Sequence, residues 1–365
     1  MIAKAMVPRT VLGMTLYNNA GHLREAAASI LGQTHGDFAL LMLDDGSSDE
    51  AEAIAREYER CDARVRYWRH ERRQGMVATW KEIAEIARRE YPGAEYFAWV
   101  SDHDRWTPRW LARMVAELDS HPGAVLAYPT TQRIDERGEV TGKEPRVFDT
   151  AGVADRNDRW RHFCWNGFGS GDMVYGLMRI RALEAAGIFR PVLNPDRLLI
   201  AELTLQGEIR QVLEPLWARR ETDVASVTRQ SVSLFAGATP PRFAWPPSLQ
   251  HAVILWREYV GAPAPTVRIS PPRLAAMLAT YVVASGWRHT RKTETSKSIG
   301  RGVDNVHFVK KVVKKGVHHA IYYTLIGART VAGRCRRIGR RIVYEVLMFM
   351  HRTGLRGPSS GTRLR

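Results

Sequence analysis

Cysteine is scarce in this sequence: among 365 residues only Cys61, Cys164 and Cys335 occur. Three scattered cysteines exclude a disulfide framework or a cysteine-based zinc site and are typical of a protein from a reducing cytoplasm. Long apolar runs are missing too. Neither an N-terminal apolar segment of signal-peptide type nor a run of about 18 apolar residues exists, so we expect no signal peptide and no membrane-spanning helix.

Two phosphate-binding motifs are also absent. Gly-x-Gly-x-x-Gly does not follow the first predicted strand, and Gly-x-x-x-x-Gly-Lys-Ser/Thr occurs nowhere. Their absence disfavours dinucleotide-dependent oxidoreductases and P-loop phosphotransferases. Most of the chain lacks net charge: residues 286–365 hold 19 Lys and Arg against three acidic residues, which accounts for the whole formal charge of +16. Because residues 1–285 are neutral, we expect no nucleic acid partner.

What is present is an alternation of short apolar runs and amphipathic segments. Strands are predicted at residues 10–16, 38–43, 65–68 and 96–100, with helices between them at 22–32, 50–60 and 76–89. A strand–helix alternation at this spacing predicts an α/β fold with a mostly parallel, doubly wound sheet.

Polar residues follow the fourth predicted strand. Ser101-Asp102-His103-Asp104 places two carboxylates just beyond the strand, where ligands bind in open α/β sheets. Hard oxygen ligands at that position suit a divalent cation held between the protein and a diphosphate. The alternative is a polar turn that caps the next helix.

Four segments together resemble the family 2 glycosyltransferases, which are nucleotide-sugar enzymes of the GT-A fold. These segments are Thr15-Leu-Tyr-Asn-Asn-Ala, Leu23-Arg-Glu-Ala with Ser29-Ile-Leu-Gly-Gln-Thr34, Leu43-Asp-Asp-Gly-Ser-Ser-Asp49 and Ser101-Asp-His-Asp-Arg-Trp106. The resemblance extends over roughly residues 8–225. It is specific because four motifs occur in the family's order and at its intervals.

The resemblance implies a nucleotide site at the ends of the first two strands. Thr15, Tyr17 and Asn18 would line the base and ribose pocket, and Asp45 would accept hydrogen bonds from the base or ribose. For Asp44 we expect a structural role, in which it turns the loop and caps the following helix.

The family also has a Gly-rich turn that leads into a helix facing the nucleotide. Gly75 would mark this turn. Many relatives carry an Arg-Asn pair nearby, whereas this sequence has Trp80 and Lys81. Lys81 is therefore a candidate phosphate contact, and the alternative is a solvated helix face.

For the metal, the resemblance implies Mg²⁺ or Mn²⁺ bound by the two aspartates. Asp104 would contact the ion directly, and Asp102 would lie toward the sugar or ribose. His103 between them is expected to point away into packing.

Aromatic residues are candidate acceptor contacts, because aromatic faces stack on sugar rings. Residues 160–171 combine aromatics with glycines and are predicted as a loop that forms an acceptor-side wall. Trp165 and Asn166 in this loop, together with Trp106, are the candidates. The alternative is a corner of the core followed by a hinge.

An inverting transfer needs a general base for the acceptor hydroxyl. Residues 194–207 match the family's acidic segment that leads into a helix, with Pro195 where the first acid often stands. Asp196 is the predicted base and Glu202 the fallback. The alternative for Asp196 is a helix-capping residue.

The C-terminal part differs in composition. Residues 236–285 are predicted as a helical extension punctuated by prolines, and residues 286–365 as a basic amphipathic tail. Cations interleaved with apolar residues favour an interfacial helix on anionic lipid. A basic arm on nucleic acid and a tail that is disordered until it meets a partner are the alternatives.

Together these observations predict three parts: a glycosyltransferase domain at residues 1–235, with a nucleotide-binding half (8–130) and an acceptor half (131–235), the extension and the tail. We expect a cytoplasmic, peripheral inner-membrane enzyme. It would transfer a sugar, with inversion, from a nucleoside-diphosphate donor to a glycan or lipid-linked acceptor in cell-envelope polysaccharide synthesis. The alternatives are a sugar nucleotidyltransferase and a non-catalytic scaffold that binds glycans or membranes.

Overall fold

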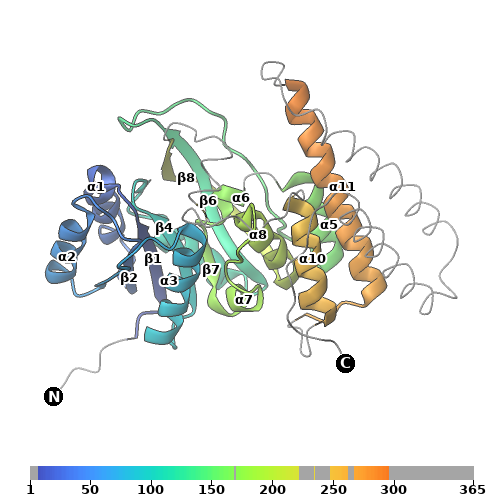
Figure 1. Ribbon diagram of the computed structural model, residues 1–365, viewed down its shortest axis with the longest axis horizontal. Helices are drawn as coiled ribbons and strands as arrows, with labels where there is room; N and C mark the ends of the chain where they lie inside the picture. Colours follow the sequence, from blue (N-terminus) through green and yellow to red (C-terminus); the bar gives the residue numbers. More distant parts are fainter. Residues whose placement is uncertain (1–6, 168–169, 222–233, 235–246, 262–266, 296–365) are drawn as a thin grey trace, which may run out of the picture.

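The computed structural model describes residues 7–167, 170–221, 234, 247–261 and 267–295, and an eight-stranded sheet lies at the centre of this part (Figure 1). The strand order is β3-β2-β1-β4-β7-β6-β8-β5. The strands are β1 (Thr10–Leu16), β2 (Phe38–Asp44), β3 (Val65–Arg69), β4 (Tyr96–Ser101), β5 (Arg105–Trp106), β6 (Ala124–Ile134), β7 (Leu177–Arg179) and β8 (Glu208–Arg220).

The first four strands run parallel, with β1 between β2 and β4, and β3 outside β2. β2 is buried along its whole length, as its continuous apolar composition predicts for a parallel strand covered on both faces. One core cluster contains the buried residues of α1 (Ala20–Leu31), α2 (Ala51–Cys61) and α4 (Trp110–Ser120), and the other contains those of α3 (Met76–Glu90). The doubly wound α/β fold is therefore confirmed.

The remaining strands mix directions. β7 is antiparallel to β4 and to β6, and β5 is antiparallel to β8. β6 and β8 are parallel, with register shifts between residues 124 and 131. This pairing brings β8, which lies far along the chain, next to β5 and thus next to the residues that follow β4.

One predicted loop is a helix. Residues 160–166 belong to α5 (Arg156–Asn166), whose N-cap Asp155 accepts hydrogen bonds from the backbone N–H groups of Asn157 and Asp158. The aromatic residues were the misleading signal: Trp160 and Phe163 are buried in the core, so the core-corner alternative holds for them.

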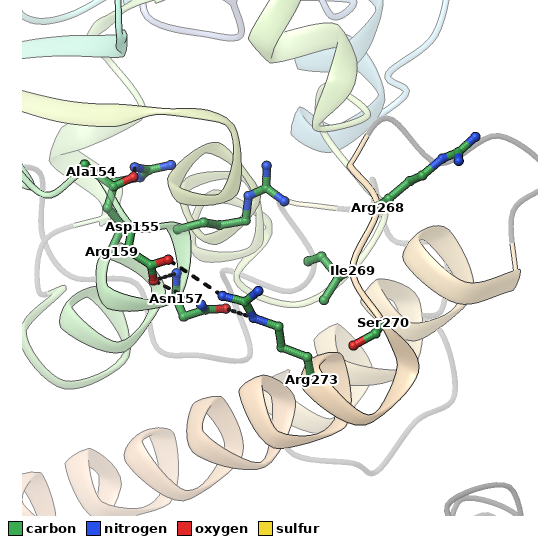
Figure 2. A pocket seen from close by; sticks show the side chains of 9 residues that line it. Ala154, Asp155, Asn157, Arg159, Arg268, Ile269, Ser270 and Arg273 are labelled. Carbon is green, nitrogen blue, oxygen red and sulfur yellow. Dashed lines mark hydrogen bonds and ion pairs between the residues drawn. The ribbon is translucent and has the colours of Figure 1, made fainter. Parts of the chain in front are cut away.

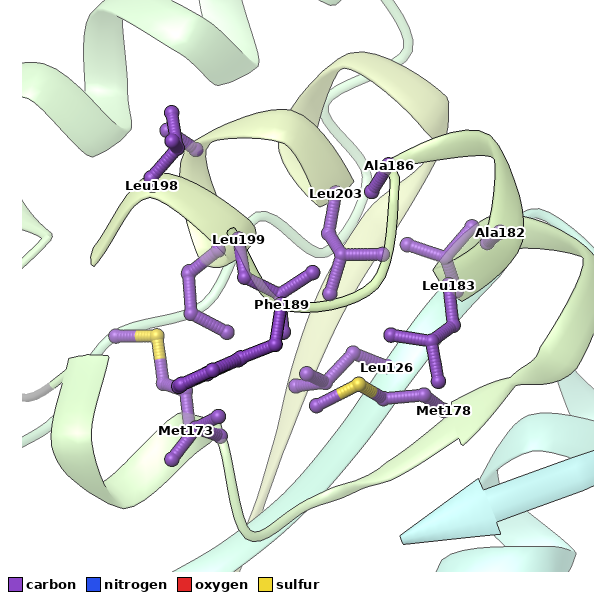
Figure 3. Packing of buried hydrophobic residues seen from close by; sticks show 14 of the residues in the cluster. Leu126, Met173, Met178, Ala182, Leu183, Ala186, Phe189, Leu198, Leu199 and Leu203 are labelled. Carbon is purple, nitrogen blue, oxygen red and sulfur yellow. The ribbon is translucent and has the colours of Figure 1, made fainter. Parts of the chain in front are cut away.

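Three further helices follow: α6 (Ser170–Met173), α7 (Ile180–Ala185) and α8 (Pro195–Gln206). Figure 3 shows Leu199 and Leu203 of α8 in the same buried cluster as Leu126 of β6 and Phe189. The apolar face of α8 thus fixes this helix, which carries Asp196, against the sheet.

The C-terminal helices share the core of the preceding domain. α11 (Pro271–Thr295) packs beside α5, and α10 (Pro247–Trp256), which continues into a π-helical turn (Arg257–Gly261), packs against α11 (Figure 1). Trp160 Nε1 donates to the Met277 carbonyl at 2.9 Å, and Tyr281 is fully buried. α11 also continues through the predicted boundary at residue 285, whereas most of the predicted basic tail lies outside the described residues.

Among the described residues, no helix is both long and apolar enough to cross a membrane.

Candidate active site

Two aspartates end β2, and the first is structural. Asp44 is fully buried, accepting hydrogen bonds from Ser47 N at 2.7 Å and from the Tyr67 hydroxyl at 3.0 Å. It therefore turns the chain after β2. The predicted capping of α2 is not seen, since Asp49 instead accepts from Ala51 N at the helix start, at 3.1 Å.

Asp45 holds the loop that precedes α3. Its Oδ1 accepts from Gln74 N at 2.6 Å and lies 3.1 Å from His70 Nδ1, and its Oδ2 accepts from Gly75 N at 2.9 Å. Gly75 has φ = 91°, a left-handed conformation that glycine adopts without strain. Arg73 Nε also lies 3.9 Å from Oδ2. The contact of Asp45 with a base or ribose stays a prediction.

The segment after β1 lies beside this loop. Thr15 is partly buried at the end of β1, and Asn18, with φ = 52°, accepts from Ser48 N at 2.8 Å. Tyr17 is 36% exposed, and the Arg73 guanidinium lies 4.0 Å from its ring centroid. Arg73 is a residue of this site that the sequence interpretation did not single out.

Asp102 joins the ends of β1 and β4. Its carboxylate accepts from Tyr17 N at 3.3 Å and from Asn19 Nδ2 at 3.1 and 3.2 Å. His103 Nδ1 lies 2.7 Å from Asp102 Oδ1, so the expectation that His103 points away is wrong. Burial lowers the pKa of His103, but its hydrogen bond to Asp102 and the charges of Asp102 and Asp104 outweigh burial and raise that pKa.

Asp104 is 1% exposed and is held by β8. Its Oδ2 accepts from Trp217 Nε1 at 3.1 Å, and its Oδ1 accepts from Arg220 N at 2.8 Å. Burial raises the pKa of the Asp104 carboxyl. Contacts with the described residues leave one lone pair on each oxygen of Asp104, whereas the contacts of Asp102 use all of its positions.

Arg219 on β8 adds a cation that the sequence interpretation missed. Its Nη1 donates to Asp172 Oδ1 and to the Gly171 carbonyl, both at 2.7 Å, and Arg133 donates to both oxygens of Asp172 at 2.7 Å. Two guanidinium groups against one carboxylate leave a net positive charge. In the sequence, Arg219 is only an arginine near the end of an apolar segment, which does not by itself indicate a site residue.

Tyr175 lies between these groups. Its ring centroid is 5.0 Å from that of Trp217, and the Arg219 guanidinium carbon is 5.7 Å from the Tyr175 ring. Burial is the main reason that the pKa of the Tyr175 hydroxyl is raised, and charges on Arg219, Asp104, Asp102 and Asp196 also act on it. The charges of the Asp102–Asp104 pair and of Asp196 thus all contribute to the shift in the pKa of this hydroxyl.

Asp196 stands in the first turn of α8. Asn194 precedes the helix with φ = 53°, and Pro195 begins it. Asp196 is only partly buried, and its Oδ2 accepts from the Ser170 hydroxyl at 2.8 Å. A Cβ added to Gly171 would lie 3.6 Å from Asp196 Oδ2 and 3.5 Å from Arg219 Nη1, so these two charged groups flank this glycine.

Glu202, the fallback base, is placed differently. It is 1% exposed, and its oxygens accept from Arg190 Nη2 at 2.9 Å and Arg190 Nε at 3.2 Å. Burial raises the pKa of Glu202, the adjacent Arg190 lowers it, and the net result is a pKa of about 7. A carboxylate held in the core by its own arginine does not reach an acceptor, so we do not propose Glu202 as the base.

Several predicted contacts lie away from these carboxylates. Trp106 is 4% exposed in the core and stacks on Trp217, so its predicted acceptor role is wrong. Lys81 lies on the solvated face of α3, 3.6 Å from Glu85. Trp165 and Asn166 are exposed at the end of α5 and remain candidate acceptor contacts.

The aspartates fit a hard cation only in part. Asp104 has unused oxygen lone pairs and a buried negative charge that a cation would balance. Among the described residues, no group of three or more His, Cys, Asp or Glu side chains is arranged to hold a metal ion. The protein therefore provides an incomplete ligand set, to which diphosphate oxygens would have to contribute.

Comparisons with known proteins find similarity to glycosyltransferases. The family described as Glycosyl transferase family 2 matches residues 12–171. An uncharacterized glycosyltransferase of Methanocaldococcus jannaschii is 28% identical over 142 residues, 38% of this chain and 47% of that protein. Protein CgeD of Bacillus subtilis is 28% identical over 131 residues, 34% of this chain and 30% of CgeD. The matches thus span less than half of either relative.

Solved structures show the same fold. The S. aureus TarS 1–349 structure in complex with UDP-GlcNAc has a TM-score of 0.57 at 13% identity, covering 80% of this chain and 76% of that one. A second TarS 1–349 structure has a TM-score of 0.55 at 14% identity, covering 80% and 75%. At this identity the likeness concerns the GT-A fold alone.

Proposed function

We propose, from the premise that residues 12–171 are a glycosyl transferase family 2 domain, that this protein is an inverting glycosyltransferase. It would transfer a sugar from a nucleoside-diphosphate donor to a hydroxyl of a glycan or a lipid-linked acceptor. The observation that carries the proposal is geometric: Asp196 of α8 and Arg219 of β8 flank Gly171, and the same strand β8 holds Asp104 through Trp217 and Arg220.

The donor would bind along the edge where β1, β2 and β4 end. Asp45 fixes the 70–75 loop, and Tyr17 with Arg73 offers a flat surface beside it for a base. UDP-GlcNAc is the first donor to test, because a TarS structure of this fold binds it.

The chemical step would use groups from both parts of the sheet. Asp196 accepts the proton of the acceptor hydroxyl while the oxygen of that hydroxyl attacks the anomeric carbon of the donor sugar. The bond from that carbon to the diphosphate breaks at the same time. Arg219 faces the negative charge that develops on the departing diphosphate. A bound Mg²⁺ or Mn²⁺ would stabilise the same charge as a Lewis acid, with Asp104 as its direct protein ligand and Asp102 positioning the neighbouring segment.

The acceptor would enter beside Gly171, next to the exposed end of α5. Trp165 offers an aromatic surface there. An acceptor of the cell envelope, held at the inner face of the membrane by the basic tail, remains part of the proposal. The described residues contain almost none of that tail.

Calorimetric titration of the full chain with UDP-GlcNAc, UDP, GDP and dTDP, with and without Mn²⁺, tests the donor site. We expect one nucleotide to bind in a metal-dependent way and Asp104→Asn to abolish the metal dependence. Asp119→Asn is the matched control, because Asp119 pairs with Arg9 before β1, at the other end of the sheet. Absence of binding by every nucleotide would favour the non-catalytic scaffold.

A further inference from the structure

A cavity lies away from the carboxylates of the candidate active site. It has a volume of about 440 Å³ and opens between the start of α5 and the segment that leads into α11 (Figure 2). Arg156 and Arg159 line it from α5, and Arg268 and Arg273 from the α11 side. Four arginines thus line one cavity in a part of the chain that has little net charge overall, although the Arg268 side chain points away from Arg159 and Arg273 in Figure 2.

Only one carboxylate lines this cavity, and it is already engaged. Asp155 Oδ1 accepts from Asn157 N at 2.8 Å and from Asp158 N at 3.1 Å. Its Oδ2 lies 3.7 Å from Arg273 Nη2, and Arg273 also donates to Asn157 Oδ1 at 2.7 Å, as the dashed lines in Figure 2 show. Asp155 therefore accepts from the N–H groups at the start of α5 and can neutralise the charge of at most one of the arginines.

The other three arginines have no carboxylate within ion-pair distance among the described residues. Arg159 is 7% exposed, and its guanidinium donates to the carbonyls of Thr204, Val153 and Ala154 at 2.7–3.0 Å. Carbonyls satisfy its donors without neutralising its charge, and burial lowers its pKa. The Nε of Arg156 is buried without a hydrogen-bond partner in the described part of the chain.

The charges of Glu208 and Asp155 act on Arg159 only from beyond ion-pair distance, and a buried cation that lacks a close counter-charge is costly. An anion that enters the cavity would reduce that cost. The helix starts contribute little, because Asp155 caps α5 and α11 begins with Pro271 and Pro272, which lack N–H donors. Arginine forks match the oxygens of phosphate in geometry and charge.

We propose that this cavity is a binding site for a phosphate ester, distinct from the sugar-transfer site. α5 separates the two: the cavity lies at its first turn, whereas Gly167 beyond its last turn accepts from Arg197, the neighbour of Asp196. A helix of 11 residues spans roughly 16 Å. The ligand is either a soluble phosphate ester, including one on an acceptor, or the headgroup of an anionic lipid.

Two measurements on the full chain test the site and separate these sources. Calorimetry with inorganic phosphate measures the affinity of the site for a soluble anion, and flotation with phosphatidylglycerol or phosphatidylcholine vesicles measures lipid binding. The test variant is Arg156→Ala with Arg268→Ala, since neither side chain is fully buried. Arg181→Ala is the control, because Arg181 is exposed on α7 and has no ion pair with a described residue.

The double variant should bind inorganic phosphate about 10- to 100-fold more weakly, the effect of losing charge-assisted hydrogen bonds. The control variant and Asp104→Asn should leave this affinity unchanged, which separates this site from the donor site. A parallel loss of phosphatidylglycerol binding identifies a lipid headgroup, and unchanged vesicle binding identifies a soluble ester. Unchanged affinity of the double variant for both phosphate and vesicles overturns the proposal.

Discussion

The two halves of the sheet hold their carboxylates in different ways. On the β1–β4 side, Asp45 is held by backbone N–H groups 29 and 30 residues further along the chain. On the other side, Asp104 is held by Trp217 and Arg220, 113 and 116 residues away. The first arrangement is closed within one segment of about 30 residues that contains α2 and β3, whereas the second depends on β8 docking against β5.

This difference separates two kinds of site residue. Backbone N–H groups of Gln74 and Gly75 hold Asp45, and the side chains of His70 and Arg73 add contacts at 3.1 and 3.9 Å. The second half instead relies on particular side chains: the indole of Trp217, and Arg133 and Arg219 around Asp172. If the halves also divide function, the first would serve mainly binding and the second mainly chemistry.

The sharpest test of that division is Asp196→Asn. Loss of the base should lower turnover roughly 10²- to 10⁴-fold while nucleotide affinity stays unchanged. Ser170→Ala, which removes only the hydroxyl that donates to Asp196, should have a much smaller effect. Steady-state kinetics and calorimetry measure the two quantities, and normal turnover in Asp196→Asn would rule out this base.

The next test asks whether the C-terminal helices are part of the second half. His251 of α10 is 1% exposed, with Nδ1 2.7 Å from the Tyr281 hydroxyl and Nε2 2.7 Å from the Leu193 carbonyl. Burial lowers its pKa to about 4, below the ordinary value of 6.5. Between these values the unfolded chain binds the extra proton, so stability falls as pH decreases.

We therefore expect this histidine to remove about 3 kcal/mol from the free energy of unfolding as pH falls from about 6.5 to about 4. Urea denaturation at several pH values measures this loss of unfolding free energy. The glutamine in His251→Gln does not titrate, so this variant should lack the part of the pH dependence that comes from His251. The same pH slope in both proteins would show that His251 is not buried as a neutral group, and so that α10 and α11 are not docked as described.

A smaller effect should come from the indole that holds Asp104. Trp217→Phe removes a hydrogen bond to a buried carboxylate, at a cost of about 1.5–3 kcal/mol in the free energy of unfolding. Trp106→Phe is the matched control: Trp106 stacks on Trp217, but its buried Nε1 has no partner among the described residues. Equal destabilisation by both substitutions would show that packing, and not the long-range hydrogen bond, dominates.

The smallest effect is expected in the first half, at Lys81. Its pair with Glu85 is exposed and spaced i,i+4, so Lys81→Ala should change stability by only about 0.3–0.5 kcal/mol and leave nucleotide affinity unchanged. A large loss of nucleotide affinity in this variant, measured by calorimetry, would restore Lys81 as a phosphate contact and contradict its placement on a solvated helix face.

The sequence by itself determined the parallel half of the fold. The apolar runs at residues 10–16 and 38–43 predict buried strands because hydrophobic periodicity is a local property, and β1 and β2 occupy nearly these positions. The turn made by Asp44 was also predicted, although its capping of α2 was not observed, and the helix that carries Asp196 was expected from the family resemblance.

Tertiary structure decided the rest. The sequence suggested a loop at Trp160 and an accessible ring at Trp106, but packing against distant elements placed the first in α5 and both in the core. The contact of His103 with Asp102, and the positions of Arg219 and Trp217 beside the aspartates, follow from the pairing of β8 with β5 and β6. Contacts between residues more than 100 positions apart leave no periodic signal in a single sequence, because either partner alone is compatible with many environments.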